Sequence, residues 1–160
     1  MSSSALATPI MSSQQFLEHW QGHRALTRRV IEAFPEDKLF TYSVGGMRPF
    51  SAFATEFLGM AVPTIKGVIT GKWEQFTEAK ATTKADLLRM WDAATGEINA
   101  LWPKISETRF QEVDTAFGQW KMPVYELLLY VRDNEIHHRG QGYVYLRSLG
   151  IEPPHFWERG

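Results

Sequence analysis

The sequence predicts an all-α protein, a four-helix bundle with a loop or short ribbon before the last helix. Four stretches repeat apolar side chains at spacings of three and four, as one face of a helix does. Capping residues, glycines or prolines bound these stretches, and no convincing set of alternating strands is present. Helices that are apolar on one stripe bury it against each other, so a bundle is expected.

The chain has the size and composition of one domain, with 160 residues, 44% of them hydrophobic and 22% charged. We expect a flexible N-terminal tail (1–11), a bundle domain (12–150) and a C-terminal tail (151–160). The start lacks the basic region and apolar stretch of a signal peptide, and no window approaches about 18 uninterrupted apolar residues. A cytoplasmic protein without membrane contact is predicted.

The first helix is expected to begin after Ser12, which can form a capping box with Gln15, and to end before Pro35. Its apolar stripe is Phe16, Trp20, Leu26, Val30 and Phe34. The glycines and proline in 35–50 indicate a connection with room for one short turn.

A second helix is expected from near Ser51 to about Thr70, with Gly71 closing it. Pro63 should bend this helix or remove part of its last turns. Its apolar face contains Phe53, Phe57 and Met60.

The third helix has Thr83 and Asp86 as a capping pair and should end at Trp102-Pro103. Its apolar stripe is Leu87, Trp91, Ala94, Ile98 and Leu101. The weak alternation in 104–120 fits either a short ribbon or an extended loop.

The last helix is expected from Val124 to about Leu149, after Pro123 and before Gly150. One side of it carries Leu127, Val131, Asn134, His138, Gln141 and Tyr145. Polar groups therefore interrupt a stripe that otherwise faces the core.

Two elements of the chain supply the candidate chemistry. Asn134 and His138 lie one turn apart, about 6 Å along the axis, so both can converge on one ion or ligand. Glu56 falls on the inward face of the second helix, where an unpaired carboxylate would cost several kcal/mol. A cation, a histidine or a bound ion should face it. Glu56, Asn134 and His138 therefore form a predicted three-ligand metal site. The alternative is a buried hydrogen-bonded pair of Glu56 and His138 without a metal, with Asn134 satisfying a neighbouring polar group.

Charge and cysteine content exclude several functions. Seventeen basic against eighteen acidic side chains give a net charge of −1, which offers no field for nucleic acid. The absence of cysteine excludes disulfides, thiolate nucleophiles, zinc fingers and Cys-ligated iron–sulfur clusters. A metal must use imidazole, carboxylate, amide or water ligands.

We expect structural roles for the other histidines of the helices and for the arginines of the last helix. His137 points about 100° away from His138 and is interpreted as structural. His19 and His23 form a second pair at helical spacing, but no carboxylate lies nearby on their face, so we expect packing or hydrogen bonding. The arginines of the last helix, expected to pair with acids or extend to solvent, are Arg132, Arg139 and Arg147.

A second apolar seam on the last helix bears on assembly. Leu129, Ile136 and Tyr143 repeat at seven residues, with Tyr125 above them and Gly140 beside them. The seam can cover another part of the same chain or contact a second copy, and we favour a homodimer.

The C-terminal run Asp133-Asn134-Glu135-Ile136-His137-His138-Arg139-Gly140-Gln141 resembles the signature of the DinB-like family of damage-inducible four-helix bundles. The segments that complete the resemblance are Tyr145-Leu146-Arg147, Leu149-Gly150, Pro153-Pro154, Met47-Arg48 and Gly71-Lys72-Trp73. It covers nearly the whole chain.

The resemblance implies a divalent-metal site of three histidines, one on the second helix and a pair on the last. Here Glu56 and Asn134 stand at two of these positions, and only His138 is unchanged. Oxygen ligands shift the preference from zinc or copper toward manganese, iron, nickel or magnesium. We expect a divalent metal, with nickel, zinc, manganese and iron all open.

The resemblance also implies a metal-dependent enzyme, a thiol transferase or isomerase or a hydrolase-type enzyme acting on small molecules. The metal would bind a thiol or water and lower its pKa. Gln141 and Tyr145 could orient the substrate, and no nucleophile of the protein itself is apparent. The alternative is a non-catalytic stress-response protein that binds a metal or a small molecule.

Overall fold

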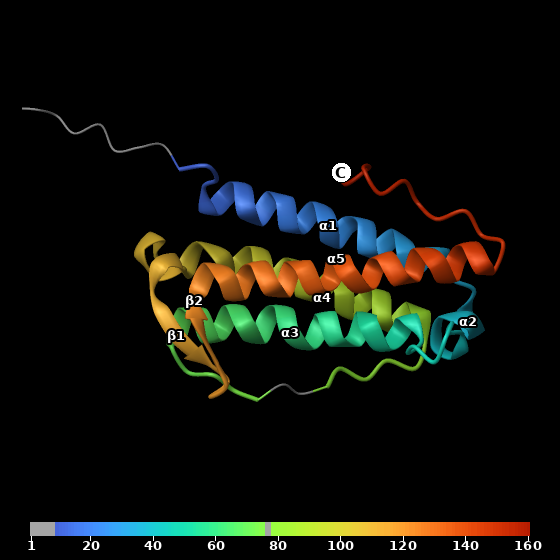
Figure 1. Ribbon diagram of the computed structural model, residues 1–160, viewed down its shortest axis with the longest axis horizontal. Coiled ribbons are helices and arrows are strands. Elements are labelled where there is room, and N and C mark those ends of the chain that lie inside the picture. The colour runs from blue at the N-terminus through green and yellow to red at the C-terminus, as the bar shows by residue number, and fades with distance from the viewer. Residues whose placement is uncertain (1–8, 76–77) are drawn as a thin grey trace, which may run out of the picture.

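A computed structural model describes residues 9–75 and 78–160, and most of the predicted N-terminal tail (1–11) lies outside these ranges. The bundle consists of α1 (Ser13–Ala33), α3 (Phe50–Thr70), α4 (Lys84–Leu101) and α5 (Val124–Ser148), as Figure 1 shows. Each of α1 and α3 packs against both α4 and α5. The predicted all-α bundle is confirmed.

Shorter elements connect the four helices. A one-and-a-half-turn helix, α2 (Glu36–Thr41), lies in the expected connection. The 3₁₀ helices η1 (Trp102–Lys104) and η2 (Glu107–Gln111) follow α4. Strands β1 (Val113–Ala116) and β2 (Trp120–Pro123) then pair antiparallel, with Val113 opposite Pro123 and Ala116 opposite Trp120. The short ribbon, rather than the extended loop, therefore precedes α5.

The helix ends follow the local signals. Ser12 accepts a hydrogen bond from the Gln15 N–H in a capping box, and the Thr83 side chain accepts one from the Asp86 N–H. Gly71 closes α3 with a φ of 70°. Pro63 lies inside α3 and removes no turn from it. Burial of the residues around the proline outweighs one missing N–H, so this part of the prediction was wrong.

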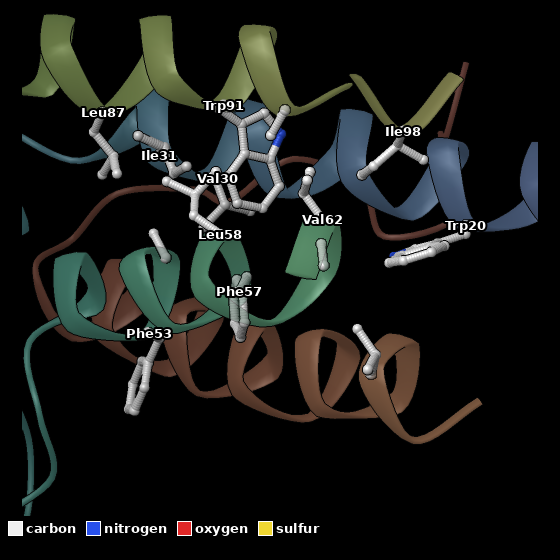
Figure 2. Packing of buried hydrophobic residues seen from close by; sticks show 14 of the residues in the cluster. Trp20, Val30, Ile31, Phe53, Phe57, Leu58, Val62, Leu87, Trp91 and Ile98 are labelled. Atoms are coloured by element: carbon white, nitrogen blue, oxygen red, sulfur yellow. The ribbon is translucent and has the colours of Figure 1, made fainter. Parts of the chain in front are cut away.

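The core fills the space between the four helices, and Figure 2 shows part of it. Its largest fully buried apolar side chains include Trp20, Trp91, Tyr145, Phe34 and Phe50. By length and composition α3 could cross a membrane, but 61% of that stretch is buried in the protein. The apolar character of α3 is that of a core helix.

The C-terminal segment (151–160) returns along α1, as Figure 1 shows, and is not a detached tail. Pro153 is buried, and an Arg159 guanidinium nitrogen lies 3.2 Å from His23 Nε2. The second seam of α5 is partly covered within the chain, since Leu129, Ile136 and Tyr143 are half-buried. A homodimer stays a prediction.

The interface of α1 with α5 buries charged groups that the sequence reading missed. Glu135 and Arg24 are fully or almost fully buried. Thr27 Oγ1 donates to Glu135 Oε1 at 2.6 Å, and the Arg24 guanidinium lies 4.2 Å above the Trp91 ring. Burial raises the pKa of Glu135, against the opposite pull of Arg24, Thr27 and Arg139. Arg139, expected to pair with an acid, enters this cluster.

His23 belongs to the same buried cluster. Its Nδ1 lies 2.9 Å from an Arg139 guanidinium nitrogen, and Arg159 approaches its Nε2. The neighbouring His19 lies against Arg132, with 3.3 Å between Nδ1 and Nη1. Burial, followed by the charges of the arginines, lowers the pKa of His23 to about 3. The imidazole is therefore neutral and engaged in hydrogen bonding.

This lowered pKa predicts an acid-sensitive fold. Because the pKa of His23 falls from 6.5 to about 3 on folding, its contribution is complete above pH 6.5 and is lost as the pH falls toward 3. Between pH 7 and pH 5 it should account for about 2 kcal/mol of unfolding free energy. His23→Gln should remove that part of the pH dependence in denaturant unfolding. The exposed His155 provides the control, and equal slopes for His23→Gln and wild type would contradict the assignment.

Candidate functional site

The three side chains predicted as ligands lie together between α3 and α5. Asn134 Nδ2 donates to Glu56 Oε1 at 3.0 Å, and His138 Nε2 lies 3.6 Å from the same oxygen. The helical repeat places Asn134 and His138 on one face of α5, and the packing of α5 on α3 brings that face to Glu56. One carboxylate oxygen is thus the point of convergence.

Aromatic stacking and a hydrogen bond fix the His138 ring. The ring stacks on Phe53, with centroids 4.6 Å apart and planes 14° apart, and the centroid of the Phe57 ring lies 6.2 Å from it. Gln141 Oε1 lies 2.9 Å from His138 Nδ1. An Nδ1–H donated to this oxygen leaves the Nε2 lone pair facing Glu56. Gln141 therefore positions the imidazole.

Arg48, just before α3, is a residue of the candidate site that the sequence analysis left without a role. Its Nη1 lies 2.6 Å from Glu56 Oε2, so the two carboxylate oxygens have different partners. Burial alone would raise the pKa of Glu56, but hydrogen bonds from Asn134 and Arg48, with the charge of Arg48, lower it. Glu56 is therefore a carboxylate at neutral pH.

Two atoms of the predicted ligand set have the spacing that a divalent cation would require. Glu56 Oε1 and His138 Nε2 are separated by 3.6 Å, the spacing of two ligands that each bind one ion at about 2.1 Å. A lone pair that faces a carboxylate oxygen is stabilised by a cation between them. Within residues 9–75 and 78–160 no group of three or more His, Asp or Glu side chains is placed to hold a metal. Asn134 turns its amide nitrogen toward Glu56, so it would become a third ligand only after its amide rotates to present the oxygen.

A cavity of about 570 Å³ opens beside Glu56 and Arg48, between α3, α5 and the ribbon. Its mainly apolar wall includes Ala52, Met60, Met122, Leu127 and Val131. This volume and lining are typical of a site for a small organic molecule.

The two predicted substrate-pocket residues do not line this cavity. Tyr145 is completely buried, and its hydroxyl donates to the Arg48 carbonyl at 2.8 Å. Gln141 contacts His138, as described above. The cavity extends toward the N-terminal half of α5, whereas Tyr145 lies about 20 Å along the axis from Val131. Sequence periodicity gave the correct face of α5 but not the direction in which the cavity extends.

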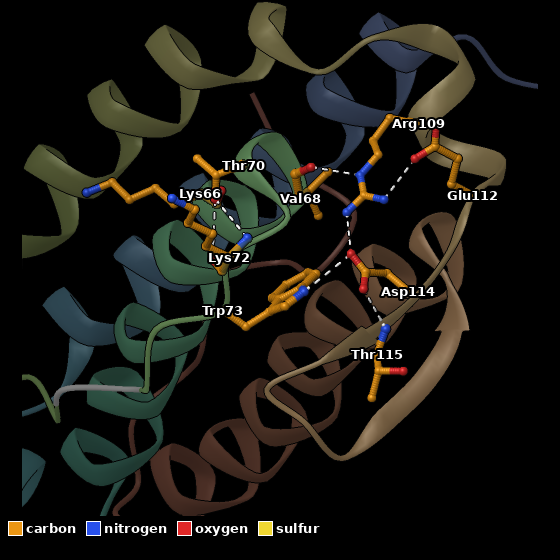
Figure 3. Close-up of polar contacts among 9 residues, drawn as sticks. All are labelled: Lys66, Val68, Thr70, Lys72, Trp73, Arg109, Glu112, Asp114 and Thr115. Carbon is orange, nitrogen blue, oxygen red and sulfur yellow. Dashed lines mark hydrogen bonds and ion pairs between the residues drawn. The ribbon is translucent and has the colours of Figure 1, made fainter.

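A polar cluster at the end of α3 holds the ribbon that forms one wall (Figure 3). Arg109 donates to the Val68 carbonyl at 2.8 Å and pairs with Asp114 at 2.5 Å and Glu112 at 2.8 Å. Trp73 Nε1 also donates to Asp114, at 3.3 Å. The half-buried Arg109 thereby ties the ribbon to the body of the bundle.

Comparison with known proteins gives one family and several related folds. The DinB family model matches residues 1–159. Protein YjoA of Bacillus subtilis (strain 168) is 26% identical over 152 residues, which cover 92% of this chain and 97% of YjoA.

Two crystal structures of DinB-like proteins share the fold. The structure of YjoA from Bacillus subtilis has a TM-score of 0.74 at 20% identity, covering 91% of this chain and 99% of that one. A DinB-like protein from Bacillus cereus ATCC 10987 has a TM-score of 0.70 at 20% identity, covering 89% of this chain and 95% of that one.

The position of Tyr145 makes it a structural residue, and this is testable. Tyr145→Phe removes one hydrogen bond to the Arg48 carbonyl and should lower the free energy of unfolding by about 1 kcal/mol. Metal content and ligand affinity should stay as in wild type. Trp157→Phe, at an exposed position of the C-terminal segment, should change neither. If Tyr145→Phe leaves the stability unchanged but alters ligand affinity, Tyr145 belongs to the binding site and this interpretation is wrong.

Proposed function

The chain belongs to the DinB family, and from this membership and the geometry of the site we propose that it is a divalent-metal-binding protein. Glu56, Asn134 and His138 would hold the ion at the polar side of the cavity. The observation that carries the proposal is the 3.6 Å separation of His138 Nε2 and Glu56 Oε1, two atoms that can both bind one ion.

The reaction class that this site suits is a metal-dependent transfer or hydrolysis on a small molecule. A divalent ion supplies a nucleophile at neutral pH by lowering the pKa of water or of a thiol. Gln141 retains the proton on His138 Nδ1, and the apolar wall holds the organic part of the substrate while it excludes water. Because the chain has no cysteine, a thiol in the reaction would come from a second small molecule.

A non-catalytic binding protein is the second candidate, and the Arg48 contact favours it. The guanidinium lies 2.6 Å from Glu56 and already neutralises the carboxylate without a metal. In this alternative the cavity binds a small molecule that is not converted.

Elemental analysis tests the metal proposal directly. Protein purified without a nickel column should contain about one divalent ion per chain. Glu56→Ala and His138→Ala each remove one of the two strong donors and should weaken metal binding by about tenfold or more. His137→Ala, at the adjacent exposed position, should retain the metal. Metal-free wild-type protein that takes up no added ion would contradict the proposal.

Two further variants separate the candidates. Arg48→Gln removes the competing guanidinium and should preserve or tighten metal binding if an ion uses Glu56. If the cluster is metal-free, the same change only leaves Glu56 without its counter-ion and lowers stability. The double change Glu56→His with Asn134→His restores three imidazoles and should tighten zinc binding.

We also propose that the protein acts in the cytoplasm as a homodimer formed through the second seam of α5. Tyr125 is 38% exposed there, and Leu129 and Ile136 are only half-buried. Light scattering at micromolar concentration should give twice the chain mass of 18.4 kDa. Ile136→Glu should yield the monomer, because it places a charge in the contact. A monomeric wild type would contradict the assembly.

A further inference from the structure

Aromatic side chains from two elements gather at the rim of the cavity. Phe117 and Trp120 come from the ribbon and Tyr130 from α5, and we call these three residues the aromatic rim. Trp120 is 46% and Tyr130 58% exposed. The Phe117 and Trp120 rings lie 6.2 Å apart at 76°. Exposed aromatic side chains that share one cavity indicate a binding surface, because exposed side chains contribute little to the stability of the folded chain.

The ionisable side chains that line the cavity carry a net negative charge. They are Arg48, Glu56 and Glu78, which gives one positive against two negative groups. Arg48 is paired with Glu56, so the exposed carboxylate of Glu78 supplies the excess. Lys121 does not line the cavity, because alternation along β2 turns it away from the side of Trp120 and Met122. The exposed carboxylate of Glu78 therefore favours a cation in this part of the cavity.

The ribbon presents its aromatic rings on a braced support. The contacts of Arg109 with Val68 and Asp114 tie β1 to α3, as Figure 3 shows. The turn between the strands holds Phe117 at a φ of 54°, a conformation uncommon for a residue with a side chain. Because the turn is tight and the strand is held in place, these side chains would lose less conformational entropy when a ligand binds.

From these observations we propose that the cavity binds a small molecule carrying an alkylated or quaternary ammonium group at the aromatic rim. Trp120 and Tyr130 offer ring faces to the cation, and Glu78 supplies the countercharge. The remainder of the molecule extends along the apolar wall toward Glu56. The inference rests on the proposed function only in placing the ligand in the same cavity.

Choline and 3,3-dimethyl-1-butanol form a matched pair of probes, since they share a shape and differ in charge. Titration calorimetry on protein stripped of metal should show choline binding at least about fivefold more tightly. Trp120→Ala, Tyr130→Ala and Glu78→Gln should each reduce this preference, and Trp120→Phe should retain part of it. The control is Trp157→Ala, because Trp157 is 63% exposed in the C-terminal segment, outside the cavity.

The outcomes separate this inference from the metal proposal. Equal affinity for the two probes, no choline binding, or an unchanged preference in both alanine variants of the rim would overturn it. Trp120 and Tyr130 are exposed, so their replacement should leave the unfolding transition near that of wild type, and the Phe variant keeps a folded reference. Metal content is measured separately, and a protein that prefers choline yet binds no metal would refute only the proposed metal function.

Discussion

The structure depends on how α5 satisfies buried polar groups on two sides at once. Glu135 and Arg139 face α1, where Thr27 and His23 hydrogen-bond them. Asn134 and His138, each one residue earlier, face Glu56 on α3. Neighbouring residues of a helix point about 100° apart, so the rotation that satisfies one pair also fixes the other. The cluster buried against α1 therefore orients the candidate site on α3.

This coupling explains why charged side chains remain inside a bundle that apolar residues could fill. A buried carboxylate or guanidinium is costly unless its partners are in place, and any other rotation of α5 would separate them. Gln141 and the Phe53 ring complete the constraint on His138. The position of Glu56 Oε1 relative to two side chains of α5 follows from packing that lies mostly outside the site.

The cavity has a second and separate origin. Its walls come from α3 and α5, but its rim comes from the ribbon, which Arg109 and Asp114 fix to the end of α3. The bundle thus places the polar side, and the ribbon determines what can approach it. Related structures share the fold, whereas the lining of this cavity depends on individual side chains such as Trp120 and Glu78.

Features that depend on local periodicity could be predicted from the order of the amino acids alone. Capping residues and apolar spacing located the helices, and the resemblance at the C-terminal run is confirmed by the family match. The i,i+4 spacing on α5 and the inward position of Glu56 also sufficed to select three side chains that meet. Each of these is a property of one segment, so no knowledge of the rest of the chain was needed.

Contacts between distant segments are seen only in the folded chain. Examples are the contact of Arg48 with Glu56, the approach of Arg24 to Glu135, and the position of the ribbon beside α5. The sequence patterns of these residues do not indicate that they lie together. Gln141 and Tyr145 share a face with His138. Gln141 contacts the imidazole, whereas the Tyr145 hydroxyl donates a hydrogen bond to a backbone carbonyl. A helical repeat specifies which way a side chain points but not what the packed bundle places in front of it.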